Sequence, residues 1–184
     1  LDKSFATFMQ QEDLNVSLVG VCDLFDFRSG LGVQASKNEV RPGGRPKETA
    51  IVYRHYTDLL SNDDIDAVIV ATPDHWHSRI TIDAAKAGKH VYCEKGLTRT
   101  FDEAIDVYDT VKRTGITFQL GHQNRQVEAN DKAKRIIDQG LLGPINMVEL
   151  TTNRNSPWGA WVWGIHPDGN ERTIDWKTFQ EPVP

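Results

Sequence analysis

Two opposite charges, Glu94 and Lys95, stand side by side where a short buried strand is predicted to end. The residues before them, Val91 to Cys93, are apolar or aromatic, as buried strands require. In open α/β sheets, ligands bind beyond the carboxyl ends of the parallel strands, so this pair is placed to face a bound molecule. A lysine partly removed from water can exchange a proton with a substrate hydroxyl. An exposed surface ion pair is the simpler alternative, and the dipeptide alone does not decide between the two.

A second acidic residue, Asp23, ends the apolar run that begins at Asn15. A Rossmann domain places an acid at such a strand end to bind the adenosine ribose hydroxyls, about 20 residues after a glycine-rich turn. No glycine occurs before Gly20, so either the first strand and the glycine-rich turn of such a domain are missing from this chain, or the domain does not bind a dinucleotide. On the residues alone, a helix cap or an exposed turn residue is the competing interpretation of Asp23.

A third polar stretch, residues 71–77, follows another predicted strand and reads Ala-Thr-Pro-Asp-His-Trp-His. His75 and His77 with one carboxylate make an incomplete zinc set, so we predict no metal site. Two interpretations stay open. In one, the acid of this stretch caps the following helix. In the other, Thr72, Pro73 and His77 lie along the edge of a ligand.

The elements that would position these residues alternate regularly along the chain. Apolar runs predict strands, and helical patterns lie between them. The predicted strands cover residues 15–23, 51–56, 66–72, 89–93 and 116–120, and the predicted helices cover 25–36, 58–60, 76–87, 100–114 and 125–139. This order predicts an α/β fold with a doubly wound parallel sheet of the Rossmann type.

Two of the predicted helices carry apolar patterns. The first begins with a capping box at Thr100 and Glu103. Its apolar stripe is formed by Phe101, Ala104, Ile105, Tyr108 and Val111. In the helix at 125–139 the residues expected to face inward are Ala129, Ala133, Ile136 and Ile137. Residues 1–12 have the pattern of an amphipathic helix end, and residues 41–46 that of an exposed loop.

The character of the sequence changes after Gly143 and Pro144. We therefore predict a nucleotide-binding domain over residues 1–143 and the beginning of a second domain over 144–184. Residues 145–152 alternate as a half-buried strand does, and residues 153–184 have the composition of a loop.

Composition excludes several classes of function. The 184 residues carry a formal net charge of −5, which disfavours binding to nucleic acid or to an anionic membrane surface. No apolar run approaches the roughly 18 residues that a membrane span needs. The two cysteines, Cys22 and Cys93, are expected to be reduced, buried thiols. The compartment stays open between cytoplasm and periplasm.

Four stretches occur in a fixed order: Asp23, residues 66–77, residues 87–95 (Ala-Gly-Lys-His-Val-Tyr-Cys-Glu-Lys) and residues 121–125 (Gly-His-Gln-Asn-Arg). Together they resemble the glucose-fructose oxidoreductase, inositol dehydrogenase and rhizopine-catabolism (Gfo/Idh/MocA) family, over most of residues 1–150. The combination is specific, whereas any one of these stretches is a weak signal.

The resemblance implies an oxidoreductase that uses a nicotinamide cofactor on a sugar, cyclitol or related polyol. Asp23 would bind the adenosine ribose, and Glu94 and Lys95 would stand beside the nicotinamide ribose and the reacting carbon. Lys95 is the implied catalytic residue, assisting proton transfer at the substrate oxygen. The other implied cofactor contacts are Thr72, Pro73, His75, His77, Gln123, Asn124 and Arg125. A carboxylate at Asp23 favours NAD over NADP because it repels the extra 2′-phosphate, although Arg28 nearby would offset this effect.

Two departures from the family pattern matter. The family follows the lysine with proline where this chain has Gly96, so the backbone that aims Lys95 is expected to be looser. The family also carries an Asp and a His in its C-terminal domain, which are expected beyond Pro184. The 184 residues alone are therefore expected to be inactive. Three hypotheses remain: a sugar or polyol dehydrogenase, a glycoside-cleaving enzyme that uses a transient hydride transfer, and a non-catalytic dinucleotide-binding protein.

The last residues offer a weak indication of substrate. The candidates are Asn153, Arg154, Trp161 and Trp163, because flat rings can stack on a sugar while amide and guanidinium groups bind its hydroxyls. Packing inside the protein or a subunit contact is the alternative. By resemblance, the second domain would be α+β and would form homo-oligomers.

Overall fold

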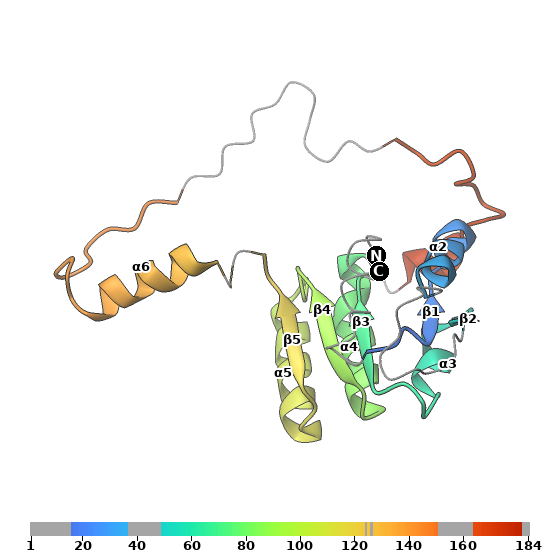
Figure 1. The fold of residues 1–184 in the computed structure, drawn as a ribbon, viewed down its shortest axis with the longest axis horizontal. Coiled ribbons are helices and arrows are strands. Elements are labelled where there is room, and N and C mark those ends of the chain that lie inside the picture. The colour runs from blue at the N-terminus through green and yellow to red at the C-terminus, as the bar shows by residue number, and fades with distance from the viewer. Residues whose placement is uncertain (1–15, 37–48, 124, 126, 151–163, 182–184) are drawn as a thin grey trace. The chain divides into compact units, whose positions relative to one another are not determined.

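Strands and helices alternate through most of the chain in the computed structural model, which describes residues 16–36, 49–123, 125, 127–150 and 164–181 (Figure 1). Contacts divide the chain into two units, Leu1–Gly121 with Asp168–Pro184, and His122–Pro167. The first unit contains β1 (Gly20–Cys22), α2 (Asp26–Ser36), β2 (Ile51–Tyr53), α3 (Tyr56–Leu60), β3 (Ala67–Val70), α4 (Asp74–Lys86), β4 (His90–Glu94), α5 (Phe101–Thr114), β5 (Phe118–Gly121) and α7 (Trp176–Gln180). The second contains α6 (Glu128–Asp138).

Each pair of strands in the described residues is parallel, which confirms the predicted α/β class. β1 pairs with β2, and β4 lies between β3 and β5. Val70 pairs with Cys93, and Glu94 pairs with Gly121, so the carboxyl ends of β3, β4 and β5 meet at one edge. Within the described residues the strands form two separate sheets, and β1 and β3 are each an edge strand.

The core of the first unit lies where α4 packs on β3 and β4. Its buried members are Leu60, Val70, Trp76, Ile80, Ala84, Val91 and Cys93. α4 also contacts α5, and the two helices run beside each other along the three-stranded sheet (Figure 1). Apolar side chains one helical turn apart on α4, such as Trp76, Ile80 and Ala84, therefore meet the apolar strands directly.

The ends of α5 are fixed by the residues that the sequence predicted. The Thr100 side chain accepts a hydrogen bond from the Glu103 backbone N–H at 3.2 Å. Glu103 Oε2 accepts from the backbone N–H of Arg99 rather than of Thr100, so the capping box is displaced by one residue. Gly115 ends the helix with a φ of 70°, a left-handed conformation that glycine adopts without strain.

The apolar stripe predicted on α5 is mostly exposed. Phe101, Ile105 and Tyr108 are 79%, 43% and 62% exposed, while Val107 and Thr110 are the buried residues of the helix. The predicted helix is confirmed, but the prediction of which of its faces is buried is wrong. An apolar face shows only that a helix can pack against a neighbouring element. Here α4 packs against the opposite face of α5.

Two predictions for the second unit are wrong. None of the residues of α6 is buried, although Ile136 and Ile137 were expected to face inward with Ala129 and Ala133. Residues 145–150 form no strand and are exposed, where a half-buried strand was predicted. Both patterns need a neighbouring surface to bury them, and the described residues of this unit provide none.

The C-terminal prediction of a loop is wrong for Trp176–Gln180, which form α7. Asp175 caps this helix, because its Oδ1 accepts from the Thr178 backbone N–H at 3.1 Å and its Oδ2 from the Thr178 hydroxyl at 2.9 Å. The Asp-x-x-Thr spacing was the available signal. The predicted helix at residues 1–12 and the loop at 41–46 lie outside the described residues. No helix in the described part of the chain is long and apolar enough to cross a membrane.

Candidate nucleotide-binding site

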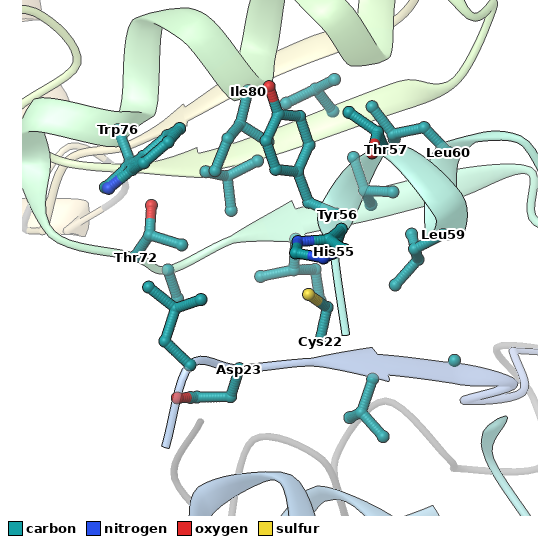
Figure 2. Close-up of a pocket in the computed structure, with 18 of the residues that line it drawn as sticks. Cys22, Asp23, His55, Tyr56, Thr57, Leu59, Leu60, Thr72, Trp76 and Ile80 are labelled. Atoms are coloured by element: carbon teal, nitrogen blue, oxygen red, sulfur yellow. The ribbon is translucent and has the colours of Figure 1, made fainter. Parts of the chain in front are cut away.

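A cavity of about 1150 Å³ lies between the two sheets of the first unit. β1 and β3 line it from opposite sides, and α3 and the first turns of α4 also contribute to its wall. Its lining is largely apolar, with Val21, Leu59, Val68 and Ile80 among the contributing residues. Figure 2 shows Asp23, Thr72 and Trp76 together at one end of this space.

The structure brings Asp23, Thr72 and Pro73 to this one cavity, although they follow strands of two different sheets. These three were predicted as cofactor contacts from separate stretches of sequence. Arg28 lines the same cavity, as expected for a residue that could modify the effect of Asp23. His75, His77, Glu94, Lys95 and Gln123 do not line it.

Asp23 sits one residue beyond β1 and is partly buried. Its Oδ1 accepts the Phe25 backbone N–H at 2.9 Å, so the competing interpretation as a turn residue holds for one of its oxygens. Burial raises the pKa of the Asp23 carboxyl, and the Phe25 N–H and the Arg28 guanidinium oppose that rise. A carboxylate so placed needs hydrogen-bond donors from a partner to offset the loss of water.

Lys95 directly follows β4 and its side chain is exposed. Lys95 was expected to lie partly out of water, and the described residues do not bury it. Glu94 is only partly buried, and its Oε2 accepts the backbone N–H of Lys95 at 3.3 Å. The peptide bond between Lys95 and Gly96 is cis.

The two histidines of the third polar stretch contact backbone carbonyls. His77 is 2% exposed, with Nδ1 at 2.8 Å from Gly96 O and Nε2 at 2.7 Å from Thr72 O. His75 Nε2 lies 2.7 Å from Phe179 O, and the Trp76 indole donates to the same oxygen at 3.3 Å. Their predicted contacts with a cofactor stay predictions.

Residues 174–179 pack near the end of β1, although the sequence did not associate them with the site. Ile174 forms an isolated antiparallel bridge with Phe25, and the Asp175 N–H donates to Leu24 O at 3.0 Å. Phe179 packs edge-on against His75 at 5.5 Å. Ile174, Trp176 and Phe179 all line the cavity, so α7 contributes to the wall beside Asp23 and Thr72. The aromatic pattern of this segment was visible, but nothing in the sequence showed that it returns to β1.

The other predicted residues belong to the second unit or lie outside the described residues. Gln123 and Arg125 are exposed and belong to the second unit. Asn124 and the substrate candidates Asn153, Arg154, Trp161 and Trp163 lie outside the described residues.

Neither cysteine has the character of a nucleophile. Burial, together with the nearby charges of Asp23 and Asp58, raises the pKa of Cys22 to about 11. Burial also raises the pKa of Cys93 to about 11. Both thiols are therefore protonated at neutral pH, and in the structure both are free. Nowhere in the described ranges do three His, Cys, Asp or Glu side chains gather to hold a metal ion.

Comparison with known proteins places this arrangement in a family. Residues 31–122 match the family model described as an oxidoreductase family with an NAD-binding Rossmann fold. A levoglucosan dehydrogenase from Pseudarthrobacter phenanthrenivorans is 40% identical over 90 residues, which cover 49% of this chain and 23% of that protein. An alpha-N-acetylgalactosaminidase from Shewanella oneidensis is 27% identical over 164 residues, covering 89% of this chain and 34% of that protein.

A solved structure agrees in fold. The myo-inositol 2-dehydrogenase from Lactobacillus plantarum superposes with a TM-score of 0.60 at 29% identity, covering 76% of this chain and 38% of that one. This chain thus spans less than two-fifths of each of these three proteins. The family match covers half of the chain and includes Thr72, Pro73, Glu94 and Lys95, and the parallel sheets and helices are those of its fold. The chain belongs to the Gfo/Idh/MocA oxidoreductase family, with its NAD-binding Rossmann fold.

Proposed function

We propose that the protein is an NAD-dependent dehydrogenase that oxidises a carbinol group of a sugar, cyclitol or related polyol. The observation that carries the proposal is the cavity that joins Asp23 to Thr72 and Pro73 at the carboxyl ends of two parallel strands. Ligands of open α/β sheets bind at such ends. The relatives named as levoglucosan and inositol dehydrogenases support the substrate class.

The residues present fit a dinucleotide. Burial raises the pKa of the Asp23 carboxyl, so hydrogen-bond donors would stabilise its charged form. The two hydroxyls of a ribose are such donors. Asp23 would hold the adenosine ribose, with Thr72 and Pro73 beside it. A nicotinamide cofactor, when bound, supplies the hydride acceptor. NAD is the expected form because the Asp23 carboxylate repels a 2′-phosphate.

Lys95 would act on the substrate hydroxyl as the proton acceptor during oxidation. It follows β4 at the same edge of the sheet as Thr72, its exposed side chain is accessible to a ligand, and as the neutral amine it would accept the hydroxyl proton. Proton transfer by a positioned side chain contributes about 10²–10⁴-fold to the rate. Glu94 would stand beside the nicotinamide ribose.

The test is a steady-state assay of nicotinamide absorbance with a panel of polyols that includes myo-inositol and levoglucosan. It uses a longer protein that contains these residues, because this chain spans less than two-fifths of the related dehydrogenases. Lys95→Ala should lower kcat by about 10²-fold or more. The matched control is Lys86→Ala, an exposed lysine in the last turn of α4, which should leave the rate unchanged. Equal rates for Lys95→Ala and the parent would contradict the proposal.

A second candidate is a glycoside-cleaving enzyme of the same family, favoured by the similarity to an alpha-N-acetylgalactosaminidase. Release of an aglycone without net change in nicotinamide absorbance would identify this activity. The third candidate, a non-catalytic dinucleotide-binding protein, predicts cofactor binding that is unaffected by Lys95→Ala, with no turnover of any sugar.

We also propose that a further parallel strand, followed by a glycine-rich turn, completes the nucleotide-binding domain inside the cavity. β1 and β3 are edge strands that line the cavity. In a complete doubly wound domain the first strand lies between the second and the fourth, which would correspond here to β1 and β3. A chain extended at its amino end by such a segment should protect the facing amides of β1 and β3 from hydrogen exchange. Unchanged exchange at both strands would contradict this. The domain boundary at residue 143 and the formation of homo-oligomers through the second domain are further parts of the proposal.

A further inference from the structure

Among the described side chains with about 2% exposure or less, His77 is the largest, although it is polar and stands in the first turn of α4. A buried imidazole is retained at little cost only when its nitrogens have hydrogen-bond partners. Both nitrogens of His77 have one: Nδ1 faces Gly96 O at 2.8 Å and Nε2 faces Thr72 O at 2.7 Å. Both distances fall in the hydrogen-bond range, and because carbonyl oxygens only accept, each bond requires a proton on the ring nitrogen that faces it.

The two carbonyls belong to different strand ends. Thr72 lies two residues beyond β3, and Gly96 two residues beyond β4, directly after Lys95. The ring of His77 therefore connects the turn that lines the cavity to the turn that carries the proposed proton acceptor. The connection crosses 19 residues of sequence from His77 to Gly96.

Packing does not hold Gly96 in place. The residue is exposed, and a Cβ added to it would meet no heavy atom within 4 Å. A glycine in open space has wide backbone freedom, which an anchored carbonyl removes. The looseness expected from glycine at this position is therefore countered by a buried hydrogen bond from α4.

We propose that His77 is a positioning residue that donates its Nδ1–H to Gly96 O and so fixes the backbone that aims Lys95. This deepens the proposed function and rests on it, because Lys95 matters only if it acts on a substrate. His77 contacts no reacting atom in this role. A displacement of about 1 Å in a catalytic group can cost up to 10²-fold in rate, so loss of the anchor should lower kcat by about tenfold or more.

The proton on Nδ1 is the critical requirement. A neutral imidazole donates to one of the two carbonyls, and a doubly protonated ring donates to both. Either form with a proton on Nδ1 makes the bond to Gly96 O. A ring protonated only on Nε2 would bond Thr72 O and would leave Gly96 unanchored.

His75 provides the matched control within the same turn of helix. Its Nε2 contacts Phe179 O at 2.7 Å, and its side chain is 11% exposed. It therefore connects α4 to α7, and not to the Lys95 turn. Replacing His75 should disturb the α7 contact and leave the backbone at Lys95 and Gly96 as it is in the parent.

The experiment is NMR on the ¹⁵N,¹³C-labelled chain without cofactor. We expect a coupling across the hydrogen bond between His77 Nδ1 and the Gly96 carbonyl carbon, together with a protonated Nδ1. In His77→Gln and His77→Leu, ¹⁵N relaxation should show increased backbone motion at Lys95 and Gly96, whereas His75→Leu should not. In the longer protein, His77→Gln should lower kcat about tenfold with little change in the KM for NAD.

A ring protonated on Nε2 alone would overturn the proposal, and this measurement on the parent needs no variant to fold. Unchanged backbone motion at Lys95 and Gly96 in a folded His77→Gln would also overturn it. Because the NMR observations require neither cofactor nor turnover, they separate the two ideas. A parent protein that oxidises no polyol would refute the proposed function, while the Nδ1 coupling would still establish the anchor.

Discussion

Asp23 combines a structural cost with a proposed binding role. Burial raises the pKa of its carboxyl above the usual value of 3.8. The folded chain therefore keeps this proton to higher pH than the unfolded chain does. As pH rises through the unfolded pKa and on to the folded pKa, the contribution of this group to stability falls, and above the folded pKa the loss is complete.

Asp23→Asn should consequently make the protein more stable than the parent at neutral pH and should remove this part of the pH dependence. The amide can still accept the Phe25 N–H, so the turn after β1 is kept. Urea unfolding at a series of pH values from about 3 to 8 measures the effect. Asp26→Asn, in an exposed ion pair with Arg54, is the control. A parent and an Asp23→Asn variant with parallel pH profiles would show that burial of Asp23 has no such cost.

Asp23 and Thr72, where a strand end and a family motif coincide, both line the cavity, and their contacts with a cofactor stay predictions. His77 was predicted as a cofactor contact, and the structure gives it two backbone partners in loops 19 and five residues away. A histidine's partner depends on which turns meet around it. Local sequence carries no record of that.

Among the elements, α2 and β1 pack closely because of one glycine. A Cβ added at Gly32 would overlap the Val21 side chain, whereas a Cβ at Gly30 would meet nothing within 4 Å. Both glycines are inside α2, so they share the same helical propensity cost.

Gly32→Ala should destabilise the protein by about 1–3 kcal/mol, since the helix must move away from β1. Gly30→Ala should stabilise it by about 0.5–1 kcal/mol, because alanine favours the helix. Chemical denaturation of the two variants and the parent measures both effects. Equal changes for the two variants would mean that contact with Val21 does not limit the position of α2.

The alternation of strands and helices was predictable because buried strands and capped helices have local signals. Thr100, Gly115 and the apolar run of β4 are examples. The burial of helix faces was less predictable: Phe101 and Tyr108 have the same periodicity as core residues yet are exposed. Which face is covered depends on the neighbouring element, here α4, and therefore on tertiary packing.

At the scale of the molecule, the division of the sheet into two was not predicted. No glycine-rich turn was predicted before Gly20, and the described residues form two sheets with a cavity between them. The return of α7 to the end of β1 was not foreseen. Long-range contacts of this kind, such as Ile174 with Phe25, have no periodic signature in the sequence.

The central claim is that the strand ends around Asp23 bind NAD. Isothermal titration of NAD and NADP into the longer protein, its Asp23→Ala variant and the Asp26→Ala control tests it most directly. We predict that NAD binds more tightly than NADP, that Asp23→Ala weakens NAD binding by about tenfold or more, and that Asp26→Ala leaves it unchanged. Tighter binding of NADP than of NAD, or an Asp23→Ala variant with the affinity of the parent, would contradict the account.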